Sequence, residues 1–186
     1  MEAGAEVRVA LDAGHGARAG GGHTGASANA LVEDELALDM VKRVGHHLRA
    51  GGHETVYTRA DRRLVALAKR AWTARFTRCE LFLSIHCNAG PISAHGVEAF
   101  VVEGDARSRG LAERLASAVV AEGLSDRGVK WDNQSQHPRL AVLRGTYRRM
   151  PAVLLEIGFL TNAHDAGLLK QAAWRERVAK AIAGAI

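Results

Sequence analysis

Three residues that could bind a metal or transfer a proton lie at or just beyond the ends of apolar segments. His15 follows one such segment closely, and His86 and Glu156 are each the last residue of another. The carboxyl ends of parallel strands gather at one edge of a sheet, so we expect these side chains to meet there. Two imidazoles and one carboxylate, with a position left to water, are the ligand set of a hydrolytic zinc centre. No local spacing supports the site, however, and a buried histidine without a ligand remains the alternative for each histidine.

The segments that would position these residues alternate between strand patterns and helix patterns. This alternation is typical of an α/β fold, and we expect a single three-layer α/β/α domain over residues 1–186 with a mostly parallel sheet of about six strands. The predicted strands are 7–11, 53–58, 81–86, 96–102, 140–143 and 151–156. The predicted helices are 33–48, 62–76, 108–122 and a closing helix that begins within 162–165 and extends to 182.

Two of these helices have apolar faces that can be specified in advance. The helix at 33–48 begins with the acidic residues Glu33, Asp34 and Glu35, whose expected role is to stabilise the helix dipole. Apolar residues at helical spacing predict the buried faces. These are Leu36, Met40, Val41, Val44 and Leu48 in this helix, and Leu64, Leu67, Ala68, Ala71 and Trp72 in the helix at 62–76.

The composition limits the classes of partner. The chain has 186 residues, enough for one domain with a sizeable core, and a net charge of +5 that favours anionic partners. The cations are scattered, and aromatic residues are only 5% of the chain, so we do not expect a base-stacking surface for nucleic acid. The glycine-rich loop from Gly14 to Gly25 could suggest phosphate binding, but it has neither GxxxxGK[ST] nor a GxGxxG that opens a helix.

The cysteines and the N-terminus indicate where the chain is made. Cys79 and Cys87 flank the strand predicted at 81–86, so we expect them to lie too far apart for a disulfide and to remain free. Free thiols fit synthesis in a reducing cytoplasm. Residues 1–6 have neither a basic nor an apolar region of a signal peptide, and no apolar run is long enough for stable membrane insertion.

Several segments together resemble the zinc-dependent N-acetylmuramoyl-L-alanine amidases of the amidase type 3 family. They occur in the family's order from near residue 7 to the C-terminus, and their combination is far more specific than any one of them. The matching segments are LDAGHG at 11–16, Glu33 with Leu38, YTRAD at 57–61, SIHCNA at 84–89, RGVK at 127–130, LAVLR at 140–144 and PAVLLEIGFLTN at 151–162.

The resemblance implies a role for each candidate residue. His15, Glu33 and His86 would bind one Zn²⁺, and Glu156 would be the catalytic carboxylate rather than a ligand. Glu33 is preferred because Leu38 lies at the family's offset from it, with Glu35 as the alternative if the register is shifted. The implied fold is a single α/β domain with a twisted sheet of roughly six strands.

The implied substrate is peptidoglycan, cut at the amide between N-acetylmuramic acid and the L-alanine of the stem peptide. Asn88 would help to bind substrate, although a structural role in the turn after the strand is equally compatible with its position. The chain departs from the family at Ala13, Arg75 and Cys87, where proline, asparagine and a small residue are more usual. We expect these to be changes in the scaffold.

The resemblance also suggests a biological context. The stretch 91–144 has no room for the long insertion that covers the zinc in some host cell-division amidases, so we expect a permanently open site. With no leader, linker or wall-binding module visible, we expect a monomeric phage-type endolysin that is made in the cytoplasm and acts on the cell wall. The alternatives are a host amidase domain without its leader, a zinc peptidase that cuts within the stem peptide, and a wall-binding module without activity.

Overall fold

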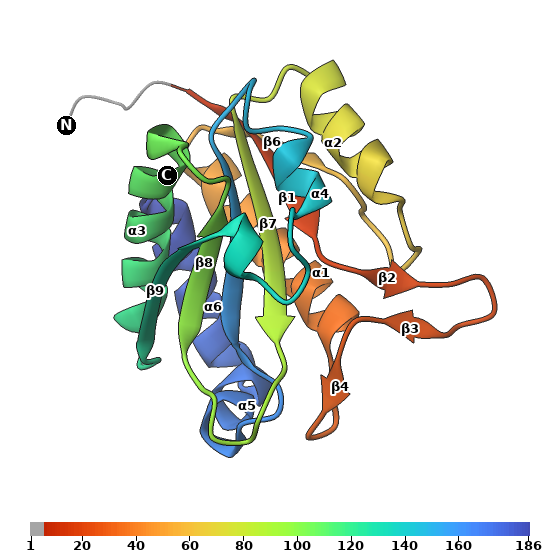
Figure 1. Cartoon of the computed structure of the whole chain (residues 1–186), viewed down its shortest axis with the longest axis vertical. Coiled ribbons are helices and arrows are strands. Elements are labelled where there is room, and N and C mark those ends of the chain that lie inside the picture. The colour runs from red at the N-terminus through yellow and green to blue at the C-terminus, as the bar shows by residue number, and fades with distance from the viewer. Residues whose placement is uncertain (1–5) are drawn as a thin grey trace.

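A six-stranded sheet runs through the middle of the molecule and has helices on both faces (Figure 1). The computed structural model describes residues 6–186. All neighbouring strands are parallel except β10 and β8, so the mostly parallel α/β fold predicted from the sequence is confirmed. In spatial order the strands are β6 (Glu54–Tyr57), β1 (Arg8–Ala13), β7 (Leu81–Asn88), β10 (Ala152–Phe159), β8 (Val97–Val101) and β9 (Asp126–Trp131).

The larger core lies on the face of the sheet that lies at the back in Figure 1. Four helices cover this face, and the predicted apolar face of the first of them is buried as expected. Along each central strand every second residue points into this core, as Leu83, Ile85 and Cys87 do on β7. The helices are α1 (Glu33–Ala50), α3 (Ala106–Val120), α5 (Ala163–Lys170) and α6 (Ala172–Gly184).

A smaller core lies on the opposite face, under α2 (Leu67–Phe76) and α4 (Ala141–Arg144). The predicted apolar stripe of α2 is confirmed only at Ala71, because its other four members are exposed. Arg70 and Ala74, which were not predicted, are buried beside Ala71. Two small residues on the buried side let the helix pack closely, while Arg70 reaches polar groups beneath it. The helix also begins at Leu67 rather than at residue 62.

The sixth strand is not the one that the sequence predicts. The segment predicted as a strand at 140–143 forms most of the short helix α4, because four apolar residues fit a helix turn as well as a strand. The strand instead lies at Asp126–Trp131, in the stretch interpreted as a polar connector. This strand pairs on one side only, so its exposed residues carry little of the apolar signal of a central strand. The short helix η1 (Asp132–Gln134) follows it.

Two small hairpins connect β1 to α1 and bring the first turn of α1 to the edge of the sheet. Their strands are β2 (Gly16–Ala17), β3 (His23–Thr24), β4 (Ser27–Ala28) and β5 (Leu31–Val32). Asn162 caps α5 by accepting hydrogen bonds from the backbone N–H groups of His164 and Asp165, as predicted.

Two further expectations concern the cysteines and membrane insertion. Cys79 and Cys87 are buried free thiols, and burial raises the pKa of both. Within residues 6–186, no helix combines the length and the apolar character needed to cross a bilayer. The N-terminal stretch in which no signal peptide is predicted lies outside the described residues, except for Glu6.

Candidate metal centre

Three polar residues on neighbouring strands lie together on the face of the sheet opposite the larger core. Strand alternation places His86 on β7, Glu156 on β10 and Glu98 on β8 on this face. Glu156 is directly opposite His86 on one side and Glu98 on the other, so the three form a row across neighbouring strands. A groove of about 840 Å³ runs over this row and is lined by all three.

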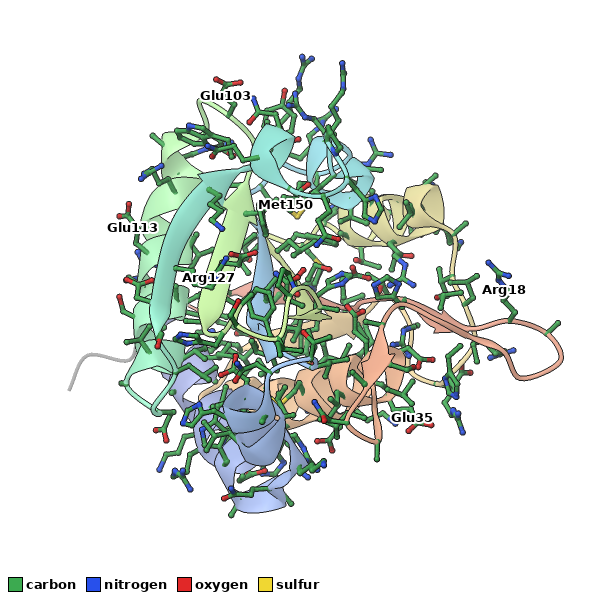
Figure 2. The ribbon with its side chains drawn as sticks, turned by 60° about the horizontal axis from the view of Figure 1, so that its bottom comes forward. Arg18, Glu35, Glu103, Glu113, Arg127 and Met150 are labelled. Carbon is green, nitrogen blue, oxygen red and sulfur yellow. The ribbon has the colours of Figure 1, made fainter. Side chains whose placement is uncertain are left out.

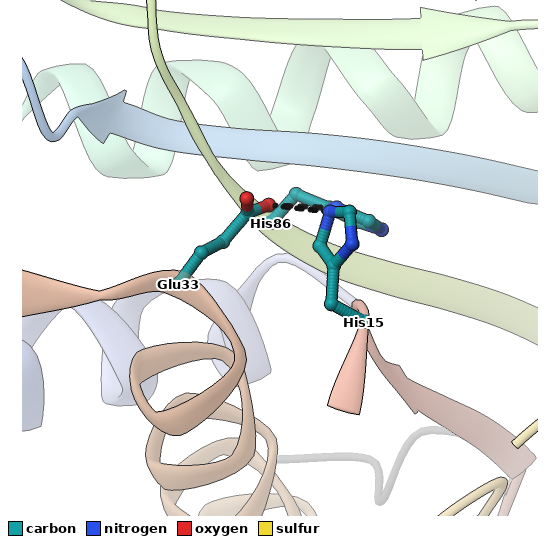
Figure 3. Close-up of side chains that lie close together, drawn as sticks. All are labelled: His15, Glu33 and His86. Atoms are coloured by element: carbon teal, nitrogen blue, oxygen red, sulfur yellow. Dashed lines mark hydrogen bonds and ion pairs between the residues drawn. The ribbon is translucent and has the colours of Figure 1, made fainter. Parts of the chain in front are cut away.

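Three of the predicted site residues line this groove, and their side chains point toward one another (Figure 3). Glu33 Oε1 lies 3.1 Å from His15 Nε2 and 3.0 Å from His86 Nδ1. The two imidazole rings are 5.0 Å apart at an angle of 77°, so their nitrogens approach one carboxylate oxygen from different directions. One ligand atom from each residue lies within 4.8 Å of the others, which is the spacing of a potential metal site.

Glu33, not Glu35, is the acidic residue of α1 that joins the two histidines. The backbone N–H of Ala26 donates to Glu33 Oε2 over 2.8 Å, which leaves Oε1 directed at the rings. Glu35 is exposed and pairs with Arg62 over 2.7 Å. Burial by itself raises the pKa of Glu33, but hydrogen bonds from His15 and His86 outweigh it and hold that pKa well below its usual value. The cluster therefore contains an ionised carboxylate.

The backbone that presents His15 is held by buried arginines. His15 has a φ of 58°, in the left-handed region that residues other than glycine seldom occupy. Arg59 donates to the carbonyl oxygens of Ala13 over 2.9 Å and Gly14 over 2.7 Å, and Arg70 donates to that of His15. These bonds hold a strained conformation at the site, where such strain is most often found.

Glycine is required at two positions around the imidazoles. A Cβ on Gly14 would lie 2.4 Å from Cε1 of His86, and a Cβ on Gly25 would lie 2.7 Å from the His15 ring. Both rings therefore occupy space that any side chain at these positions would take. Gly14 and Gly25 therefore serve the close packing around the two imidazoles.

Replacement of Arg70 by methionine should lower the free energy of unfolding by about 3–5 kcal/mol, because it would leave a buried carboxylate without its cation. Arg70 Nη1 lies 2.9 Å from Asp12 Oδ1, with side-chain exposures of 2% and 1%. Chemical denaturation would measure the change, with Arg75→Met, an exposed residue of the same helix, as the matched control. Equal stability of the two variants would contradict this role of Arg70.

Glu156 is the polar residue of the row that lacks a partner. Its Oε2 atom is one of two buried side-chain polar atoms in the described part of the chain without a hydrogen bond. Burial, followed by the charges of Glu33 and Glu98, raises the pKa of Glu156 well above its usual value. A raised pKa makes the ionised carboxylate a stronger base, which suits a residue that accepts a proton and later returns it.

The donor set fits a zinc ion. Two imidazoles and an ionised carboxylate converge from three elements, and the groove leaves room for a fourth ligand on their open side. The partnerless Oε2 of Glu156 is a second sign that the groove takes a polar group that the protein itself does not supply.

Asn88 and Glu98 complete the polar wall of the groove. Asn88 donates from Nδ2 to Glu98 over 2.6 Å and accepts from the N–H of Ala89 over 2.9 Å. These contacts support the structural role considered for Asn88, and substrate binding by this residue stays a prediction. Glu98 was missed because a single carboxylate in a predicted strand carries no motif, although it shares the strand face of Phe100 in the smaller core.

The fold and this site together define a class of α/β proteins in which a His–Glu–His group that could hold a metal ion lies beside an unpartnered carboxyl group. Comparison with known proteins makes the assignment specific. A family model described as N-acetylmuramoyl-L-alanine amidase matches residues 9–186. The chain belongs to this family of enzymes.

Individual relatives agree with this membership. The chain is 37% identical over 178 residues to the N-acetylmuramoyl-L-alanine amidase LytC of Bacillus subtilis, covering 94% of this chain and 34% of LytC. It is 34% identical to the endolysin of Bacillus phage SPP1, covering 92% of this chain and 62% of the endolysin. It therefore spans about a third of the first relative and three fifths of the second.

A solved structure shares the whole architecture. The catalytic domain of CwlV, an N-acetylmuramoyl-L-alanine amidase from Bacillus (Paenibacillus) polymyxa var. colistinus, superposes with a TM-score of 0.81 at 30% identity. The match covers 96% of this chain and 95% of that domain.

Proposed function

We propose that this chain is a zinc-dependent amidase domain that cleaves peptidoglycan between N-acetylmuramic acid and the L-alanine of the stem peptide. The observation that carries the proposal is the convergence of His15, Glu33 and His86 beside the buried, partnerless Glu156 in one groove. Membership of the amidase family supports the choice of bond. Residues 1–186 would then form one catalytic domain.

His15, Glu33 and His86 would hold the ion, which would polarise the scissile carbonyl and make water a stronger nucleophile. Glu156 would accept the proton of the attacking water and return it to the amine of L-alanine as the C–N bond breaks. In support of this role, Glu156 lies opposite His86 in the sheet register. Arg127 and Lys130 both donate to Glu98 and not to Glu156.

We also propose that the site is permanently open and that the domain acts as a phage-type endolysin. In support of the first point, His15 retains 32% of its side-chain exposure and faces the groove. Between β7 and β10, the described elements are β8, α3, β9, η1 and α4, and the residues around the ligands leave the groove accessible. The SPP1 endolysin supports the second point, while LytC represents the host alternative.

Chelation tests the metal dependence of this proposal. The purified protein is expected to lose its activity on peptidoglycan suspensions after treatment with a chelator, and stoichiometric Zn²⁺ is expected to restore it. Activity that persists in protein shown by elemental analysis to be free of metal would contradict the proposal. Lysis without any accessory protein, measured as loss of turbidity of cells with exposed walls, would support the open site.

A further inference from the structure

A cluster with a net positive charge borders the groove on the side away from the metal centre. Glu98 is buried, and its Oε2 atom accepts a hydrogen bond from Arg127 Nε over 2.7 Å and one from Lys130 Nζ. Burial raises the pKa of Glu98, but these two hydrogen bonds outweigh it and lower that pKa overall. One ionised carboxylate therefore faces two cations.

A β-bulge directs Arg127 to the groove. Between β8 and β9, Val97 pairs with Asp126 and Ala99 pairs with Val129, so two steps along β8 match three along β9. Gly128 absorbs the extra residue with a φ of 77°. Without the bulge, Arg127 would share the strand face of Val129, which packs on the larger core. With the bulge, Arg127 and Lys130 both reach Glu98 on the groove face.

The guanidinium group of Arg127 is positioned by contacts with Phe159, Glu98 and His95, and one of its nitrogens is left to bind a ligand. Its Cζ lies 4.8 Å from the ring centroid of Phe159, Nε donates to Glu98, and Nη1 donates to the carbonyl oxygen of His95 over 3.4 Å. Nη2 has no partner within residues 6–186. Arg127 lines the groove, with a side-chain exposure of 33%, whereas Lys130 does not line it. Figure 2 labels Arg127 beside β8 and β9.

We propose that Arg127 binds a free carboxylate of the stem peptide, that of the second residue after the scissile amide. This inference rests on the proposed amidase function. Glu98 lies two strands from His86, a distance of about 10 Å, since neighbouring strands are spaced about 4.8 Å apart. An extended peptide advances about 3.5 Å per residue, so a carboxylate on the second residue comes within reach of the arginine side chain. Arginine offers its donors in the planar geometry that carboxylates accept.

The test uses two muramoyl peptides that differ only at the second stem residue, which is either D-glutamate or D-isoglutamine. The first has a free α-carboxylate and the second has an uncharged amide in its place. The wild type is expected to prefer the acid by about tenfold in kcat/KM, mainly through KM. Arg127→Met should lower kcat/KM for the acid by about tenfold and for the amide by less than about threefold, which removes most of the preference.

Lys130→Met is the matched control, because it also takes one cation from Glu98 but leaves the groove guanidinium in place. It should keep the preference for the acid. Arg127→Lys, which retains the charge but not the planar donors, should show an intermediate preference and serves as the second variant if Arg127→Met does not fold.

Three results would overturn the inference. They are equal cleavage of both peptides by the wild type, equal losses on both peptides in Arg127→Met, and loss of the preference in Lys130→Met. A wild type that digests peptidoglycan but shows no preference contradicts this inference alone. A wild type that digests neither peptidoglycan nor the two peptides contradicts the proposed function as well.

Discussion

Glu156→Gln is expected to reduce turnover of peptidoglycan by about 10²- to 10⁴-fold, the range that a general acid–base group contributes. The substitution keeps the size of the side chain and removes its ability to exchange a proton. Glu156 lies opposite His86 and Glu98 in the sheet, and no other carboxyl group of the row lacks a partner. Initial rates of soluble product release would measure the loss.

The decisive companion measurement is the metal content of the same variant. Because Glu156 is assigned to proton transfer and not to ligation, Glu156→Gln should retain about one zinc per chain. Glu113→Gln, on the exposed side of α3, is the control and should match the wild type in both respects. Loss of zinc from Glu156→Gln would show that Glu156 is a ligand, which is the role that the pattern of strand-end residues suggests without the family resemblance.

Glu33→Gln is expected to weaken zinc binding by more than about 100-fold, since even the partners of ligands contribute 10- to 100-fold. Glu33 supplies the only carboxylate within the His15–His86 cluster. Glutamine at position 33 would lack the negative charge that hydrogen bonds from both histidines stabilise in the metal-free protein. Competition with a chromophoric chelator would give the affinity.

Glu35→Gln is the matched control for this experiment, two residues along the same helix turn. Its carboxylate contacts Arg62 at the surface, so zinc affinity should be unchanged. Addition of zinc should raise the unfolding temperature of the wild type and of Glu35→Gln, but not that of Glu33→Gln, because only a bound ligand stabilises the native state. If zinc instead stabilised Glu33→Gln but not Glu35→Gln, Glu35 would be the ligand.

The strand-end residues of the site could be predicted because strand alternation and sheet topology are regular. Leu83, Ile85 and Cys87 enter the larger core, so His86 must face the other side of the sheet, and the same holds for Glu156 on β10. Glu33 was selected by the resemblance and not by its own pattern. Its contact with the histidines depends on the β4–β5 hairpin, which positions the start of α1.

Other parts of the site depend on contacts that no local pattern records. Arg70 has the sequence context of a solvated helix residue, yet it is buried because backbone carbonyls around His15 need donors. The strand β9 lies at the sheet edge and contains a bulge, so its polar residues resemble a connector. Arg127 belongs to one of the segments that match the family, but its position beside Glu98 depends on the bulge.

The most direct test of the central claim is the chemistry of the ends that digestion creates. Purified peptidoglycan incubated with the zinc-loaded protein would be analysed by mass spectrometry and by N-terminal labelling. The proposed function predicts free lactyl carboxylates on N-acetylmuramic acid and new N-terminal L-alanine, in equal amounts and without shortened stem peptides or new reducing sugars. New N-termini within the stem peptide, new reducing ends, or no new ends at all would contradict it.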